Sequence, residues 1–214
     1  MEPYCAERGV TFWSIGRAGD RLSVIDDWVI RQATMADLPH LLDIFALARQ
    51  YMAEHGNPTQ WTDGYPSAPL VSDDIASGDC YVCVRENKIV ATFVLREGED
   101  PTYEVIEDGA WPNDDPYATI HRIASNGKVK GMVNLSIKFA LQHHDTLRID
   151  THRDNMVMQR AIEKEGFEYC GVIHCAGHKW QAAGGSGDAT QQHDPTTERL
   201  AYLLSKKAPS PIGR

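Results

Sequence analysis

The stretch from residue 119 to residue 141 limits the possible folds more than any other part of the chain. Residues 119–124 have the β-branched composition of a strand, and residues 125–131 form a short polar loop with two glycines. The next segment carries apolar side chains at helical spacing. Its stripe consists of Val133, Ile137, Ala140, Leu141 and His144, with Leu135 and Phe139 at the edge. A strand that leads through a short loop into an amphipathic helix predicts a mixed α/β (α+β) domain.

The 125–131 loop has features of a phosphate-binding turn. Gly127 and Gly131 permit close backbone approach, and Lys128 and Lys130 add positive charge. Backbone N–H groups that converge before a helix, together with the positive end of that helix, attract anions. Junctions of this kind also occur where nothing binds, so the loop alone leaves a purely structural role open.

Strand and helix patterns alternate on both sides of this unit. The residues predict strands at 28–31, 81–84, 89–95, 147–150 and 167–173 and helices at 34–52, 71–77 and 155–165. Residues 198–204 fit a closing strand or a short helix, of which the strand is favoured. Thr34 and Asp37 have capping-box spacing, and Gly166 is placed to end the last helix, in which Met158, Ala161 and Ile162 face inward. We expect residues 98–118, rich in Asp, Glu and Pro, to form a long surface excursion, and residues 174–197 to form a loop.

Domain organisation follows from where these patterns begin and end. We expect an N-terminal extension at 1–27, one domain at 28–205 and a C-terminal tail at 206–214. A chain of 214 residues is long enough for one domain with a full core.

Charge and cysteine content narrow the class of protein. A formal net charge of −9 argues against a nucleic-acid partner, which is held mainly by clustered Lys and Arg. No apolar run approaches the roughly 20 residues that cross a bilayer, and residues 1–10 lack a signal-peptide pattern. Five cysteines, an odd number, are typical of reduced thiols. We therefore expect a cytoplasmic protein without a membrane partner.

Two segments resemble the GNAT N-acetyltransferases, and the order of elements matches that family over residues 28–204. Residues 128–133 (KVKGMV) look like its acetyl-CoA signature, which runs Gln or Arg, two residues, Gly, one residue, Gly or Ala. Residues 148–171 resemble the family's downstream strand, Asn-bearing helix and Gly-Phe turn. The chain departs from the pattern at Lys128, at Val133, where a small residue is expected, and at Ile162, where many members place a tyrosine thought to protonate the leaving thiolate.

The resemblance implies a mostly antiparallel mixed sheet, splayed at the acetyl-CoA site, with helices on both faces. It implies acetyl transfer from acetyl-CoA to a primary amine of a small molecule or peptide, by direct attack in a ternary complex and without a metal. It also allows a homodimer.

The same resemblance assigns cofactor-binding roles to particular residues. Backbone groups of Ile123, Ala124 and Ser125 would pair with the pantetheine arm. The pyrophosphate would be held by Lys128, Val129, Lys130, Gly131 and Met132. Asn155 and Met158 would contact the cofactor from the neighbouring helix, although an asparagine at Asn155 is equally suited to cap that helix.

Acetyl transfer to an amine benefits from a general base, because an amine with a pKa near 10 is almost wholly protonated at neutral pH. His121 is the first candidate, since strand alternation places it on the face of Ile123 and Ser125; a structural histidine is the alternative. Glu97 and Glu99 are candidates for binding a cationic acceptor; the alternative is that they are solvated side chains at the end of a strand. Trp61 and Tyr65 are candidate walls of an acceptor pocket or part of the core.

Two other functions stay open at this stage. Ile162 in the tyrosine position is compatible with a catalytically silent acyl-CoA-binding or sensor domain. A zinc-stabilised interaction module would use Cys170, His174, Cys175, His178 and His193, whose spacing fits no established finger. Cys80 and Cys83 have the spacing of a redox pair but, on a strand, point to opposite faces.

Overall fold

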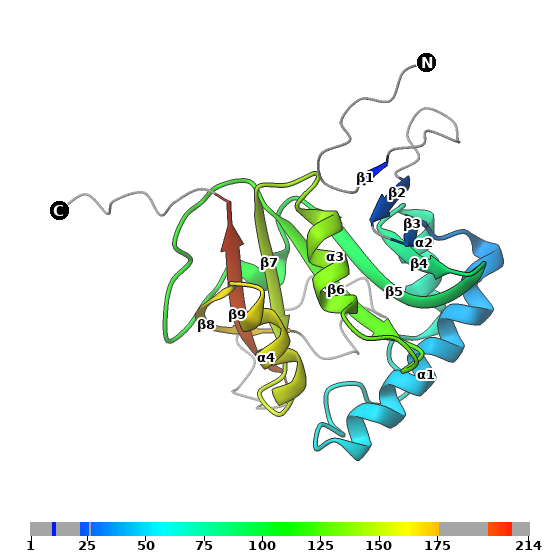
Figure 1. Cartoon of the computed structure of the whole chain (residues 1–214). Helices are drawn as coiled ribbons and strands as arrows, with labels where there is room; N and C mark the ends of the chain where they lie inside the picture. Colours follow the sequence, from blue (N-terminus) through cyan, green and yellow to red (C-terminus); the bar gives the residue numbers. More distant parts are fainter. Residues whose placement is uncertain (1–9, 12–21, 26, 176–196, 207–214) are drawn as a thin grey trace. The chain divides into compact units, whose positions relative to one another are not determined.

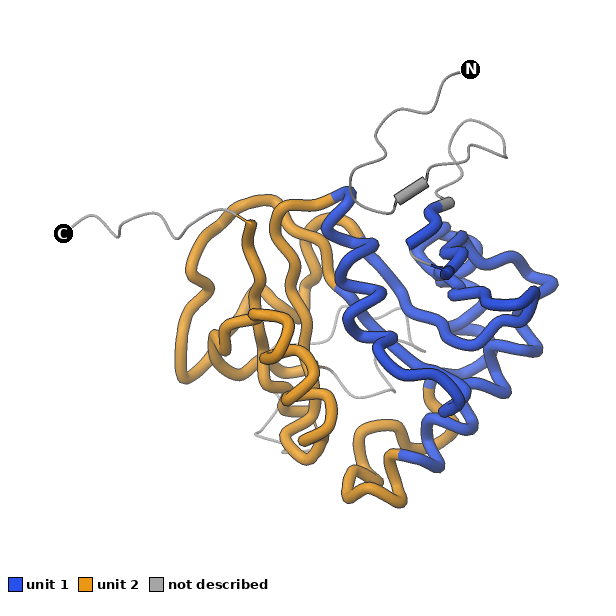
Figure 2. Tube along the Cα trace, in the orientation of Figure 1, with its two compact units in different colours: residues 1–51, 66–96, 120–143 blue, residues 52–65, 97–119, 144–214 orange. Residues whose placement is uncertain are grey.

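The structure, a computed structural model, describes residues 10–11, 22–25, 27–175 and 197–206 (Figure 1). The chain divides into two compact units (Figure 2). Unit 1 contains residues 1–51, 66–96 and 120–143, and unit 2 contains residues 52–65, 97–119 and 144–214. No helix in the described part is both long enough and apolar enough to cross a membrane.

Unit 1 is built on an antiparallel array of strands. Its strands are β1 (Val10–Thr11), β2 (Leu22–Ile25), β3 (Trp28–Gln32), β4 (Cys80–Arg85), β5 (Lys88–Glu97) and β6 (Ala118–Ser125), in that spatial order. The predicted hairpin is confirmed, because β4 pairs antiparallel with β5 across a two-residue turn. Glu86 and Asn87 at this turn have φ of 49° and 58°, and a left-handed conformation at both positions suits the twist of the flanking strands.

The first strands lie in the stretch that the sequence suggested was an extension. Residues 22–25 form β2, which pairs antiparallel with β3 through Ser23 and Ile30 among others. The side chains of Ser23 and Ile25 are buried. This short segment therefore adds a strand beside β3, which the absence of a sustained sequence period did not reveal.

Helices cover both faces of the unit 1 sheet. The helices are η1 (Met35–Asp37), α1 (Leu38–Glu54), α2 (Ala68–Ala76) and α3 (Met132–Ala140). The ring of Phe139 on α3 lies 5.7 Å from that of Phe93 on β5. Arg96, three residues further along β5, instead contacts Asp74 on α2. Because side chains three apart on a strand point to opposite faces, α2 and α3 lie on opposite sides of the sheet.

The buried stripe of α3 differs from the predicted one. The helix ends at Ala140, so His144 lies beyond it, and Val133 is only half-buried. The buried residues are Met132, Leu135, Ser136, Ile137, Phe139 and Ala140. Residues predicted at the edge, Leu135 and Phe139, are thus central, because the stripe starts one residue earlier than the sequence pattern suggested.

Unit 2 contains a three-stranded antiparallel sheet. Its strands β7 (Thr146–Thr151), β9 (Glu198–Ser205) and β8 (Glu168–His174) lie in the order β7-β9-β8. The predicted closing strand is confirmed as β9. Helix α4 (Met156–Lys164) ends before Gly166, whose φ of 89° is the expected left-handed stop. Within α4, Ile162 and Gln159 are buried, whereas Met158 and Ala161 are half-buried.

The predicted surface excursion lies at the surface, and a few of its side chains also pack onto the sheet of unit 2. This segment, residues 98–117, contains η2 (Pro101–Tyr103). Tyr103 is fully buried and packs with Ile173 and Ala201, and its hydroxyl donates to Asp150 at 2.7 Å. The Asp, Glu and Pro content of the segment predicted exposure, but its aromatic residues Tyr103, Trp111 and Tyr117 pack on the β7-β9-β8 sheet.

Candidate functional site

The 125–131 loop joins β6 to α3 with two glycines in left-handed conformations. Gly127 has a φ of 75° and Gly131, directly before α3, a φ of 82°. A β-carbon added at either position would meet nothing within 4 Å, so the space over both residues is open. An L-residue in this conformation costs on the order of 1 kcal/mol. The backbone here is both turned and accessible.

Some of the loop's amides are used by the loop itself. The N–H of Lys128 donates to Asn126 Oδ1 at 3.0 Å, and that of Gly127 to Ser125 Oγ at 3.4 Å. The first helical bond of α3 runs from Leu135 to the carbonyl of Gly131 at 2.9 Å. The N–H groups of Met132 and Val133 come before this first bond, so they have no acceptor within the helix. An anion would therefore bind at the end of the loop and the first turn of α3, rather than at the amide of Lys128.

A groove of about 920 Å³ in unit 1 borders this loop. Its walls come from the loop, from β3, from the β4–β5 hairpin around its turn, and from residues 36–40 at η1 and the start of α1. The charged groups that line it are Arg31, Arg85, Lys88 and Lys128, against Asp37 and Glu86. The basic groups outnumber the acidic ones, although the whole chain is acidic. Within this set Arg31 pairs with Asp37 at 2.8 Å, so these two charges offset each other.

Strand β6 is not regular at the predicted base. Arg122, directly after His121, has a φ of 52°, a left-handed conformation that is rare for a residue other than glycine. A residue of this kind interrupts the two-residue alternation of a strand. Strand alternation therefore does not place His121 on the face of Ile123 and Ser125, because the turn at Arg122 lies between them. His121 itself is half-buried.

Asn155 caps α4, as the alternative interpretation expected. Its Oδ1 accepts the N–H of Met158 at 3.1 Å, and its Nδ2 donates to Gln60 Oε1 at 2.9 Å. The same oxygen of Gln60 accepts from Asn57 Nδ2 at 2.6 Å. Asn155 thus ties the 55–65 loop of unit 2 to the start of α4, and its contact with a cofactor stays a prediction.

The other candidates in unit 2 have identified neighbours. The half-buried rings of Trp61 and Tyr65 lie edge to face with centroids 6.1 Å apart. Glu97 lies 3.4 Å from His144 Nε2. Ile162, in the position of the family's tyrosine, is fully buried, so this position supplies packing and no phenol.

The thiols of unit 1 are buried rather than reactive. Burial raises the pKa of both Cys80 and Cys83 to about 12, which disfavours the thiolate needed for redox chemistry. Of the zinc candidates, His178 and His193 lie outside the described residues. Within the described part of the chain, no three His, Cys, Asp or Glu residues are grouped as metal ligands would be.

Asp74 belongs to a buried ionic cluster that its place in the sequence could have indicated. Asp74 lies on the inner face of α2 between Val71 and Ile75, both of which are buried. A carboxylate at such a position needs a partner, and the structure supplies Arg122 of β6 at 2.7 Å and Arg96 of β5 at 3.3 Å. An ionisable residue inside an apolar stripe is the signal that marks this cluster.

Comparison with solved structures places this fold. A GNAT-family acetyltransferase from Streptococcus agalactiae is 26% identical, with a TM-score of 0.68 and coverage of 85% of this chain and 96% of that one. A putative acetyltransferase from Staphylococcus aureus is 22% identical, with a TM-score of 0.55 and coverage of 83% and 99%. A GNAT-family acetyltransferase from Listeria monocytogenes is 17% identical, with a TM-score of 0.56 and coverage of 83% and 94%. No protein-family model and no curated protein matches the chain.

The protein has the GNAT N-acetyltransferase fold, as the sequence resemblance predicted. The similar structure at 26% identity is a GNAT-family acetyltransferase, which supports acetyl transfer as the general class of chemistry.

Proposed function

We propose that this protein transfers the acetyl group of acetyl-CoA to a primary amine of a small molecule or peptide, by direct attack in a ternary complex. The observation that carries the proposal is the 125–131 loop, whose left-handed glycines face open space before the N-terminus of α3. The likeness to a GNAT acetyltransferase at 26% identity supports it independently.

The residues present fit a pyrophosphate in part. The exposed Lys128 and Lys130 would offset its charge, and the first amides of α3 would donate to it. Two features fit a pyrophosphate less well. Val133 is larger than the small residue expected there, and the N–H of Lys128 already donates to Asn126 Oδ1. In this proposal the thioester and pantetheine arm lie along the backbone of Ile123–Ser125, with the pyrophosphate nearest Gly131 and Met132.

Transfer to the amine requires that the ammonium lose a proton before it attacks the thioester. His121 remains our proposed base, because it lies on β6 two residues before the backbone assigned to the pantetheine arm. The roles of Asn155, Met158, Trp61, Tyr65 and Glu97 stay predictions from the resemblance or from residue type.

Calorimetry with acetyl-CoA tests the binding step. We expect saturable binding by the native chain and none by Gly131→Glu, because a side chain at the left-handed position adds strain and its carboxylate repels the pyrophosphate. Lys138→Glu, which adds negative charge at an exposed position near the far end of α3, is the matched control and should bind with little change. Absence of binding by the native chain at millimolar acetyl-CoA would refute the proposal.

A screen of primary amines with detection of free thiol tests the transfer step. We expect amine-dependent release of coenzyme A, and His121→Ala should lose activity most at neutral pH, where a base is most needed. Full turnover of His121→Ala across the pH range would show that another group is the base. Binding without thiol release for every amine would instead identify a silent acyl-CoA-binding domain.

A further inference from the structure

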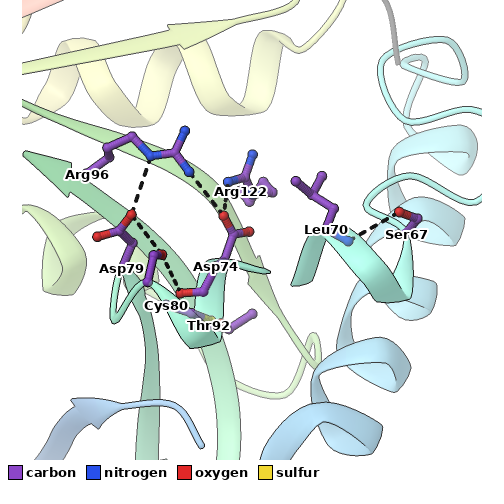
Figure 3. Close-up of polar contacts among 9 residues, drawn as sticks. Ser67, Leu70, Asp74, Asp79, Cys80, Thr92, Arg96 and Arg122 are labelled. Carbon is purple, nitrogen blue, oxygen red and sulfur yellow. Dashed lines mark hydrogen bonds and ion pairs between the residues drawn. The ribbon is translucent and has the colours of Figure 1, made fainter. Parts of the chain in front are cut away.

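The cluster around Asp74 joins a helix to the strand assigned to the acyl group. Figure 3 shows Asp74 of α2 between Arg96 and Arg122. Arg122 Nη2 lies 2.7 Å from Asp74 Oδ1, and these two side chains are 6% and 2% exposed. Arg96 is 40% exposed and spans from Asp74 at 3.3 Å to Asp79 at 3.4 Å. The inner pair is therefore withdrawn from water, whereas the outer arm is at the surface.

The same Arg122 has the left-handed backbone described above, with a φ of 52°. A strained backbone persists only when the surrounding structure holds it. The buried ion pair supplies such a hold, because it fixes the guanidinium of Arg122 against a different element. Ile123, Ala124 and Ser125 follow directly, so the direction of their N–H and C=O groups depends on the turn at Arg122.

We propose that Asp74 and Arg122 form a positioning pair that holds the left-handed turn in β6 and thereby orients the backbone of Ile123–Ser125 toward the acyl-pantetheine arm. This inference rests on the proposed function. Neither residue touches the reacting atoms in it; the pair acts through the backbone.

Stability alone is a weak reason for such a pair. Withdrawing two charges from water costs about as much as their attraction returns, and apolar replacements of similar size are often as stable. Burial is the largest influence on the Asp74 carboxyl and raises its pKa, while the charges of Arg122, Arg96 and, least, His121 lower it. The geometry that the pair imposes on β6 is the property that apolar residues would not reproduce.

Two double variants separate the turn from the charges. Asp74→Asn with Arg122→Gly removes both charges and leaves a residue that adopts the left-handed conformation without strain. Asp74→Asn with Arg122→Ala removes the same charges but disfavours that conformation. The two differ by one methyl group. We expect kcat/KM for the alanine variant to be about tenfold lower than for the glycine variant, with a matching rise in the Kd for acetyl-CoA by calorimetry.

Amide hydrogen exchange in the ligand-free proteins gives a readout independent of turnover. Exchange at residues 123–125 should be faster in the alanine variant than in the glycine variant. Arg96→Gln, which removes the outer cation from Asp74 but keeps the Asp74–Arg122 pair, should change kcat/KM by less than about threefold. Melting temperatures of all variants identify any that fail to fold.

The outcomes separate this inference from the function it rests on. If the native chain neither binds acetyl-CoA nor releases thiol, the proposed function fails. If the native chain is active but the two double variants have equal kcat/KM, equal Kd and equal exchange, the pair does not position β6 and this inference is wrong.

Discussion

Asp37 shows how a single residue fixes the entry into α1. Its carboxylate accepts two hydrogen bonds from Arg31, at 2.8 and 2.9 Å, and the N–H of Thr34 at 2.8 Å. The bonds from Arg31 are the largest cause that lowers the pKa of Asp37 to about 2. Because the unfolded chain titrates near pH 4, the carboxylate stabilises the fold above that pH.

We predict that Asp37→Asn lowers the free energy of unfolding at pH 7 by on the order of 1 kcal/mol. The stabilisation by Asp37 is lost as pH falls from about 4 to about 2, so the difference between native and variant should shrink over that window. Urea denaturation at pH 7 and at about pH 2.5 measures it. Asp43→Asn, at an exposed position on α1, should stay within about 0.5 kcal/mol of the native chain at both pH values. A difference for Asp37→Asn that is constant with pH would contradict the prediction.

At the scale of elements, Arg148 of β7 anchors the 98–117 segment. Its guanidinium lies 3.9 Å from the ring centre of Trp111 and 3.8 Å from that of Tyr117. It also donates to the carbonyl of Asn113 at 3.3 Å. Burial of this side chain lowers its pKa. A planar cation between two aromatic rings holds a long segment that has little regular structure.

We predict that Arg148→Met lowers the free energy of unfolding by about 2 kcal/mol and speeds proteolytic cleavage within residues 98–117, because methionine fills space but leaves the rings without a cation. Denaturation and limited proteolysis measure the two effects. Arg153→Met removes an ion pair from a side chain that is 61% exposed, and we expect it to cost less than about 1 kcal/mol. Equal losses in the two variants would mean that stacking contributes nothing.

Local sequence patterns predicted the helices and strands. They did not predict features that depend on contacts between residues far apart in the sequence. The strands and helices from β3 to β9 follow from apolar periods and from turn residues such as Gly166, all within short windows. The packing of Tyr103 against Ile173 and Ala201 joins residues far apart in sequence, and no local period shows it. The turn at Arg122 was missed for the same reason, since its support, Asp74, comes from another element.

At the scale of the whole molecule, the division into two units makes it possible to test which unit binds acetyl-CoA. The 125–131 loop lies in unit 1, with Asp37, whereas Arg148 lies in unit 2. A ligand at 100 times its Kd stabilises the unit that binds it by about 2.7 kcal/mol. In a chain of this size that corresponds to a rise in melting temperature of roughly 5–10 °C.

We therefore predict that acetyl-CoA at 100 times its measured Kd raises the melting transition that contains unit 1. Scanning calorimetry of the native chain and of Asp37→Asn and Arg148→Met assigns the transitions, because each variant lowers the one that contains its own unit. If the chain melts in one step, both variants lower that step and the ligand raises it. If it melts in two, the step lowered by Asp37→Asn must be among those that rise. A rise confined to the step lowered by Arg148→Met would place the binding energy outside the 125–131 loop and contradict the assignment of the cofactor to it.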